Sequence, residues 1–169
     1  IYGAASSAVL LYGLSLLYGL TGTLNLDIEF AKAMASVPIP SVVMALALVG
    51  VGLAFKAAWV PFHFWAPDVY QGAVSPTASL LATLGKATGV VLAFRLVEAL
   101  PQTDVWAEAL PIGLAVMAVA SMTFGNIAAF GQTDGHRLLA FAGVSQAGFL
   151  LLPVMTLNAD ALVFYVFVY

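Results

Sequence analysis

Long apolar stretches separated by short polar clusters run through the whole chain. A helix that crosses a bilayer needs about 20 mostly apolar residues, and the sequence divides into pieces of about that length at its Gly, Pro and acidic clusters. The predicted spans are about Tyr2–Leu20, Ser41–Tyr70, Pro76–Leu100, Ala109–Phe130 and Leu138–Val154, and a sixth opens at LNAD. The pattern predicts an all-α, polytopic transmembrane bundle of about six spans, with one Pro-broken helix.

The segments between these spans are polar. TGTLNLDIEFAKAMASVPIP (21–40) is either a short amphipathic helix or a polar loop, since its acids precede apolar residues at helical spacing. PQTDVWAE (101–108) is predicted to be a loop and GQTDGHR (131–137) a tight turn. Trp59, Trp65 and Tyr70 are expected to mark a membrane interface, where amphipathic aromatic rings gather.

Composition agrees with a membrane protein. The chain has 169 residues, 63% hydrophobic and 8% charged, against about 25% charged in a soluble domain. Both ends lie in apolar sequence, so we expect an internal fragment (1–169) of a single transmembrane domain, truncated at both ends. The absence of cysteine excludes iron–sulfur and thiolate metal sites, and a net charge of −3 without a basic run makes nucleic acid an unexpected partner. His63 and His136 lie on opposite sides of a helix that crosses the membrane and are not expected to pair over one haem or metal, so no cofactor or metal site is expected.

The stretch KAAWVPFHFWAPDVYQ (56–71) carries the main candidate chemistry. Lys56 lies inside an apolar run, where a lysine near the bilayer centre costs from about 3 to over 10 kcal/mol, and such a residue is a functional candidate by default. Pro61 lacks the N–H that would bond the carbonyl of Ala57, so the helix should break or kink there. A broken helix beside a buried cation is typical of ion sites in transporters.

Lys86 is the second candidate. It lies about 16 Å along its helix, at about 1.5 Å per residue, which is too deep for its side chain to reach the interface. We therefore expect the ammonium groups of Lys56 and Lys86 to point into the bundle, close enough for water to link them. Burial penalises the charged form of a lysine and a nearby carboxylate favours it, so a site that alternates between the two can load and release a proton. The alternative for each lysine is a structural ion pair between helices.

His63 follows Lys56 by seven residues, which would place both on one face of an unbroken helix. It is a possible proton carrier because histidine titrates near neutral pH; the alternative is a histidine bonded to backbone freed by Pro61. Asp68 is better explained as a cap or ion-pair partner.

Several polar side chains could support a file of water. Ser79, Thr83 and Lys86 share a face of a regular helix. Ser145 and Gln146 could line the same file or form hydrogen bonds between helices.

Two segments resemble a known family. FKAAWVPFHFWAPDVYQGAVSPTASLLATLGKATGVVLAFR (55–95) and FGNIAAFGQTDGHRLLAFAGVSQAGFLLL (124–152) resemble the central part of subunit N (chain 2) of respiratory complex I, with PFHFWAPDVYQG the most specific motif. The resemblance implies that Lys56 is the channel lysine of a broken helix and Lys86 the connecting lysine of the next. His136 stands where the family usually has lysine, and Gln146 stands where it often has histidine.

The resemblance implies a proton-translocating, antiporter-like subunit of an NADH:quinone oxidoreductase (a translocase) in the bacterial inner membrane. NADH, FMN, iron–sulfur clusters and quinone would be handled by the assembled complex, whose other membrane subunits would be the partners. The alternatives are a subunit of a multi-subunit cation/proton antiporter or membrane-bound hydrogenase, and a structural scaffold, against which two deep lysines argue.

Overall fold

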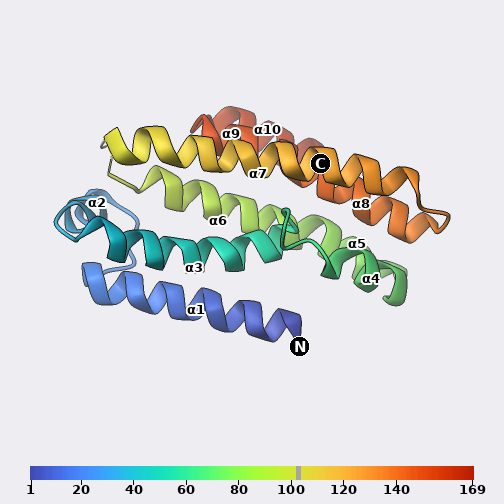
Figure 1. Cartoon of the computed structure of the whole chain (residues 1–169), viewed down its shortest axis with the longest axis horizontal. Coiled ribbons are helices and arrows are strands. Elements are labelled where there is room, and N and C mark those ends of the chain that lie inside the picture. Colours follow the sequence, from blue (N-terminus) through green and yellow to red (C-terminus); the bar gives the residue numbers. More distant parts are fainter. Residues whose placement is uncertain (102–103) are drawn as a thin grey trace.

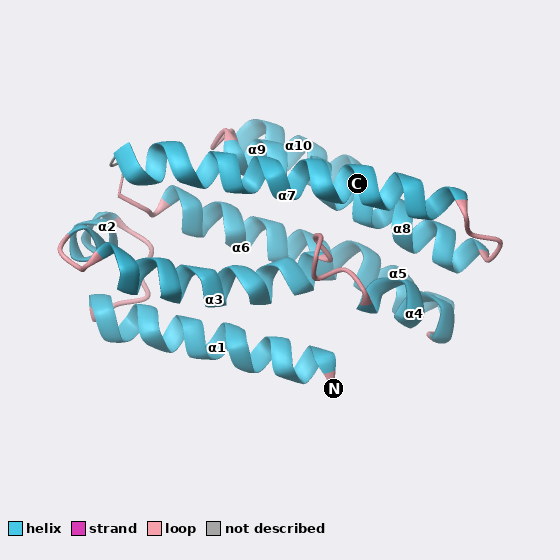
Figure 2. Cartoon of the chain, viewed as in Figure 1, coloured by secondary structure: helices cyan, strands magenta, loops and turns pink. Residues whose placement is uncertain are grey.

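The chain folds into a bundle of helices that lie roughly along one axis (Figures 1 and 2). The computed structural model describes residues 1–101 and 104–169, and within these ranges it contains helices and no strand. The elements are α1 (Tyr2–Thr21), α2 (Ile28–Ala35), α3 (Ile39–Ala57), α4 (Trp65–Gly72), α5 (Ser75–Leu80), the π-helical turn η1 (Leu81–Gly85), α6 (Lys86–Glu98), α7 (Asp104–Phe130), α8 (Gly135–Phe149), α9 (Leu151–Met155) and α10 (Ala159–Val168).

Five helical segments are long and apolar enough to cross a membrane. They are Tyr2–Thr21, Ile39–Ala57, Ser75–Glu98, Trp106–Phe130 and Gly135–Met155. The predicted polytopic helical membrane bundle is therefore confirmed. The expected sixth span corresponds to α10, which has 10 residues where about 20 are needed, so a count of six stays a prediction.

The segment between the first two spans contains a helix, which decides between the two alternatives for it. Asp27 caps α2 by accepting hydrogen bonds from the backbone N–H groups of Glu29 and Phe30. Phe30 and Met34, one turn apart, are buried against the bundle. The short helix thus closes one end of the α1–α3 pair (Figure 1).

The second span is interrupted between α3 and α4. Ala58 adopts a left-handed conformation (φ 60°, ψ 41°), residues 58–64 are not α-helical, and α4 begins at Trp65. The Val60–Pro61 peptide bond is cis. Because the helix already ends at Ala57, before the proline, the attribution of the break to Pro61 stays a prediction.

The third span differs from the expected regular helix. Its α-helical parts, α5 and α6, are joined by the π-helical turn η1, which ends directly before Lys86. A π-helical turn bonds i to i+5, so it shifts the faces of the residues after it relative to those before it. Such turns are frequent at functional sites, and no sequence signal anticipated this one.

The last spans pack most closely. Helix α7 begins at Asp104, so the predicted loop at 101–108 is wrong for its second half, while residues 102–103 lie outside the described part of the chain. Helix α7 packs along α8, and Gly125 lies at the contact. A Cβ on Gly125 would lie 2.5 Å from the backbone nitrogen of Ser145 and 2.8 Å from the carbonyl oxygen of Phe141. The two backbones can approach this closely only because position 125 lacks a side chain.

Gly125→Ala should therefore separate α7 from α8. We expect a loss of about 1–3 kcal/mol in stability, because the added methyl meets backbone atoms that cannot rotate away. The measurement is the thermal unfolding midpoint of the full-length, detergent-solubilised protein. Gly113→Ala on the same helix is the control, since among the described residues nothing lies within 4 Å of its added Cβ. Equal midpoints for the two variants would contradict the close approach.

Candidate functional site

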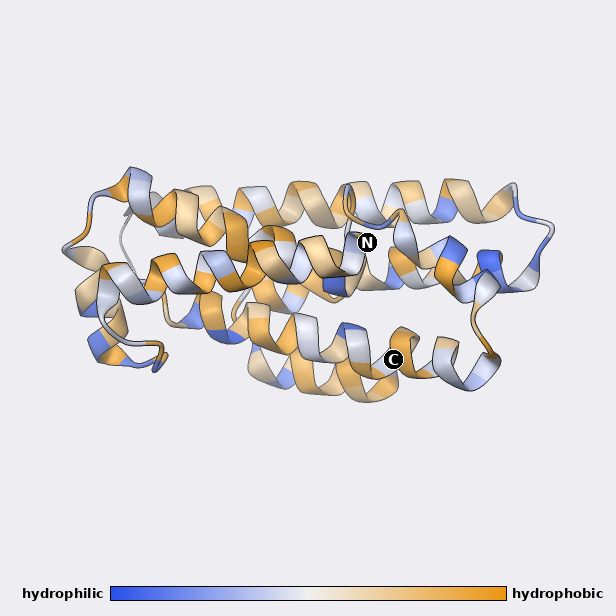
Figure 3. Ribbon diagram, turned by 90° about the horizontal axis from the view of Figure 1, so that it is seen from below, coloured by the Kyte–Doolittle hydropathy of each residue, from blue (hydrophilic) through white to orange (hydrophobic). Residues whose placement is uncertain are grey.

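Polar residues gather at the two ends of the bundle, and the helices between them are mostly apolar (Figure 3). Among the described residues, four polar or charged side chains are buried: His63, Lys86, Ser121 and Ser145. Three buried polar atoms have no hydrogen-bond partner within the described part of the chain, namely His63 Nδ1, Tyr70 Oη and Lys86 Nζ. Because buried polar atoms are normally bonded to protein or water, these atoms mark the candidate site.

Lys86 is the centre of this site. Its side chain is 0% exposed, and it begins α6 immediately after the π-helical turn. The Nζ atom lies 5.9 Å from the centroid of the Tyr70 ring, within the range of a cation–π contact. On α8, a Cβ added to Gly143 would lie 2.7 Å from Nζ, so the absence of a side chain there makes room for the ammonium group.

Lys56 lies in the last turn of α3, directly before the interruption, and its side chain is exposed on this chain. The expectation that both ammonium groups point into the bundle agrees with the burial of Lys86, and for Lys56 it stays a prediction. The two positions are nevertheless close in the fold. A Cβ on Gly89, one turn after Lys86, would lie 3.6 Å from the Cβ of Lys56, so α3 and α6 meet near both lysines.

His63 is buried (2% exposed) in the interrupted segment. Its ring centroid lies 4.4 Å from that of Phe64 and 4.5 Å from that of Phe124 on α7. The chain between Lys56 and His63 leaves the helix at Ala58, so the two do not share the face that an unbroken helix would give them. The structure brings His63 to α7 and leaves Lys56 at the surface.

One backbone N–H of the interrupted segment is satisfied by a side chain that sequence reasoning missed, and two tryptophans anchor the segment and the start of α4. The N–H of Val60 donates to Ser121 Oγ at 3.0 Å, and Trp65 Nε1 donates to the carbonyl oxygen of Phe55 at 2.7 Å. Trp59 Nε1 donates to the carbonyl oxygen of Ala147 on α8 at 2.8 Å. A single serine inside an apolar helix carries no sequence signal for such a role.

The interfacial interpretation of Trp59 and Tyr70 is wrong. Their side chains are 3% and 4% exposed, because the interruption folds this stretch against α7 and α8 and α4 packs on α8. Both rings instead contribute to the interior, Trp59 by its hydrogen bond to α8 and Tyr70 by its contact with Lys86.

The predicted polar stripe on the third span is also wrong. Ser79 and Thr83 are exposed, while Lys86 is fully buried. The hydroxyls of Ser79 and Thr83 donate to carbonyl oxygens of their own helix, those of Ser75 and Ser79. The π-helical turn between them and Lys86 explains the difference, since it breaks the regular spacing that the stripe assumed.

Ser145 and Gln146 also differ in burial. Ser145 is buried, whereas Gln146 is exposed and its Oε1 accepts a hydrogen bond of 2.6 Å from Tyr165 Oη on α10. Gln146 thus forms a hydrogen bond between helices, which was one of its two predicted roles.

A polar cluster ties α4 to the start of α8. Arg137 donates from Nη1 to Asp68 Oδ1 at 2.9 Å and to Gln71 Oε1 at 3.1 Å, so the predicted ion-pair role of Asp68 is confirmed. Asp134 caps α8, and the hydrogen bond from the backbone N–H of Arg137, followed by that from His136, holds the pKa of Asp134 below its usual value. The cap therefore stays ionised at neutral pH.

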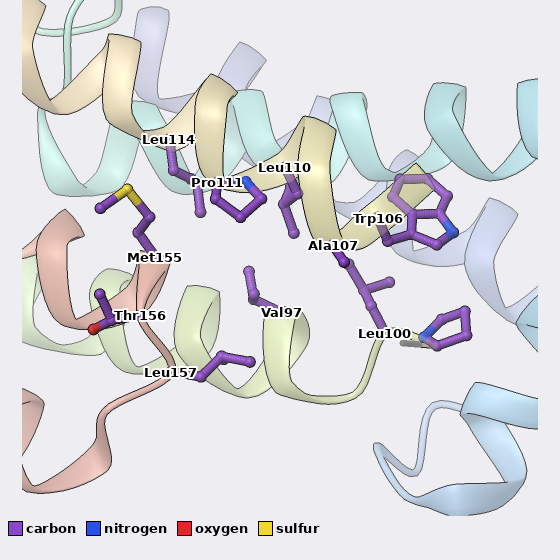
Figure 4. A pocket seen from close by; sticks show the side chains of 11 residues that line it. Val97, Leu100, Trp106, Ala107, Leu110, Pro111, Leu114, Met155, Thr156 and Leu157 are labelled. Atoms are coloured by element: carbon purple, nitrogen blue, oxygen red, sulfur yellow. The ribbon is translucent and has the colours of Figure 1, made fainter. Parts of the chain in front are cut away.

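An apolar pocket of about 200 Å³ lies away from these residues, where the end of α6 meets α7 and α9 (Figure 4). Trp106, Leu110 and Met155 are among the side chains that line it, and neither lysine does. In the described residues, no three His, Cys, Asp or Glu side chains come together to hold a metal ion.

Comparisons with known proteins agree with the helical arrangement. NADH-quinone oxidoreductase subunit N from Desulfitobacterium hafniense is 43% identical over 164 residues, which cover 94% of this chain and 32% of that protein. A chain of respiratory complex I from Thermus thermophilus with bound aureothin is 40% identical, with a TM-score of 0.80, over 98% of this chain and 34% of that one. A chain of the Mrp complex from a Dietzia species is 32% identical, with a TM-score of 0.80, over 98% and 30%.

The chain spans about a third of the length of these proteins. A family model described as "NADH:quinone oxidoreductase/Mrp antiporter, TM" matches residues 1–169. With its membrane-spanning helices and this match over its whole length, the chain belongs to the transmembrane family of NADH:quinone oxidoreductases and Mrp antiporters.

Proposed function

We propose that this chain forms part of a proton-translocating membrane subunit of an NADH:quinone oxidoreductase, of the subunit N type. The proposal is supported by family membership and by 43% identity to a protein of that name. The other membrane subunits of such a complex would be its partners, and the bacterial inner membrane its location.

The observation that carries the proposal is that Lys86 is buried without a hydrogen-bond or ion-pair partner among the described residues. Its ammonium is fully buried and, among the described residues, has neither a hydrogen-bond partner nor an ion pair. Taking an unpaired ammonium out of water costs on the order of several kcal/mol, so a lysine kept in such a place for structure alone is hard to explain. A lysine that gains and loses a proton during turnover needs an environment in which its charged form is not permanently stabilised by a partner.

Lys56 is proposed as the second carrier. It ends α3 beside the interruption and is exposed on this chain, so a polar surface of another part of the protein or of another subunit could exchange protons with it. The close approach of α3 to α6 at Gly89 brings its backbone near that of Lys86, and water could link the two ammonium groups. His63, buried with an unpartnered Nδ1 in the described residues, is a third candidate carrier.

The redox chemistry of the complex would take place elsewhere. We assign NADH, FMN, the iron–sulfur clusters and quinone to other subunits, because this chain has no cysteine and the buried groups described above suit proton transfer. This chain would affect quinone reduction only indirectly, because proton transfer by its lysines would be coupled to quinone reduction in other subunits of the assembled complex.

A subunit of a multi-subunit cation/proton antiporter is the second candidate. The 32% identity to the Mrp complex chain and the shared family model favour it. Sequencing the neighbouring genes separates the two, because genes for NADH-oxidising and iron–sulfur subunits would accompany only the first.

Lys86→Ala should abolish most coupled proton transfer, because alanine cannot bind a proton. We expect proton pumping and quinone reduction to fall at least about tenfold, while electron transfer from NADH to an artificial acceptor stays intact. Both rates are measured in membranes that carry the assembled complex. Lys32→Ala is the matched control, since Lys32 is exposed on α2. Normal pumping by Lys86→Ala would remove Lys86 from the mechanism.

Lys56→Arg tests whether the second lysine must become neutral. Arginine keeps the charge and stays protonated at any working pH, so it would rescue a structural cation and fail as a carrier. We expect Lys56→Arg to lose pumping nearly as fully as Lys56→Ala, with NADH oxidation by an artificial acceptor unchanged in both. Near-normal pumping by the arginine variant would favour a structural role for Lys56.

A further inference from the structure

A row of aromatic rings connects the two lysine-bearing helices. Phe55, which precedes Lys56, stacks on Trp65 with ring centroids 5.3 Å apart, and Trp65 meets Tyr70 edge to face at 6.3 Å. Trp65 also donates from Nε1 to the carbonyl oxygen of Phe55. The last turn of α3 and the helix beyond the interruption are thus held together by ring contacts and a hydrogen bond.

Tyr70 ends this row at the ammonium group of Lys86. The 5.9 Å between Nζ and the ring centroid is the one electrostatic contact of that ammonium within the described residues. The face of an aromatic ring carries negative charge density, so it attracts the cation and not the neutral amine. The ring can therefore hold the charged form in place without the permanent bond that a carboxylate would make.

The ring, and not the hydroxyl, makes this contact. Tyr70 Oη is buried and has no hydrogen-bond partner in the described part of the chain, so it does not bond to Nζ. The nearby hydroxyl of Tyr169 is engaged otherwise, donating to the carbonyl oxygen of Ala82 at 3.1 Å. Gly143 also lies beside the ammonium group. Because Gly143 has no side chain, it leaves room for the ammonium group.

We propose that Tyr70 is a positioning residue for Lys86. The face of the Tyr70 ring, together with the space left by Gly143, holds the protonated ammonium between the interrupted helix and α8. This inference rests on the proposed role of Lys86 as a proton carrier. The Tyr70 ring contacts Trp65, and Trp65 stacks on Phe55, the residue before Lys56. These ring contacts connect the position of Tyr70 to the end of α3 at the interruption.

The test compares Tyr70→Leu with Tyr70→Phe in the assembled complex. Leucine removes the ring and should lower proton pumping and quinone turnover about tenfold, with the KM for quinone unchanged. Phenylalanine keeps the ring and loses only the hydroxyl, so it should restore pumping to within about twofold of the parental rate. Because phenylalanine would also rescue a residue that merely fills space, the pH profile of pumping is measured as well. Its midpoint should move to lower pH in Tyr70→Leu, since the ring no longer favours the charged amine, whereas a space-filling role would leave the midpoint unchanged. Tyr12→Leu is the matched control, because Tyr12 is exposed on α1.

Two outcomes would overturn the proposal: full pumping by Tyr70→Leu, or equal loss in the leucine and phenylalanine variants, which would assign the effect to the hydroxyl. If Tyr70→Leu does not assemble, Gly143→Ala gives an independent answer, because its methyl would lie 2.7 Å from Nζ and displace the ammonium from the ring. We expect Gly143→Ala to lower pumping several-fold, and unchanged pumping would overturn the proposal.

Lys86→Ala separates this proposal from the proposed function. If Lys86→Ala loses pumping while all these variants pump normally, only the role of Tyr70 is rejected. If Lys86→Ala pumps normally, the proposed function is rejected.

Discussion

A helix that is interrupted inside an apolar bundle must find partners for its backbone, since a bilayer offers no water to bond it. Here part of the backbone of residues 58–64 bonds locally, with the N–H of Trp59 donating to Ala54 and that of Phe62 to Trp59, and further bonds anchor the segment to other helices. Ser121 accepts from the N–H of Val60, Trp59 donates to the carbonyl oxygen of Ala147, and Trp65 donates to that of Phe55. These bonds hold the interrupted segment and the start of α4 against α7, α8 and the end of α3.

The interruption decides which side chains meet the buried lysine. It turns the chain so that α4 packs on α8, and this brings the Tyr70 ring to Lys86. The π-helical turn before Lys86 has a related effect on the other helix, because it separates the buried lysine from the exposed hydroxyls that precede it. Two departures from regular helix therefore build one site.

Glycines determine how closely the helices approach around this site. Gly125 allows the backbones of α7 and α8 to touch, and Gly143 leaves space for the ammonium of Lys86. At the end of the bundle, Arg137 holds α4 to the start of α8, but its partner Asp68 is largely exposed. Exposed ion pairs contribute about 0–1 kcal/mol, so this cluster contributes little to the position of α4.

The sequence by itself determined the class of this protein and the position of its spans, because the length and hydropathy of a membrane helix are set by the bilayer. It also singled out Lys56, Lys86 and His63 as candidate proton carriers, since charged and titratable residues are conspicuous in apolar sequence. Only the tertiary structure decided that Lys86 is buried and Lys56 exposed, that Trp59 and Tyr70 face the interior, and that Ser121 satisfies the interruption. A helix that is apolar on all sides has no periodic pattern to indicate its buried face, so burial depends on which helices pack beside it.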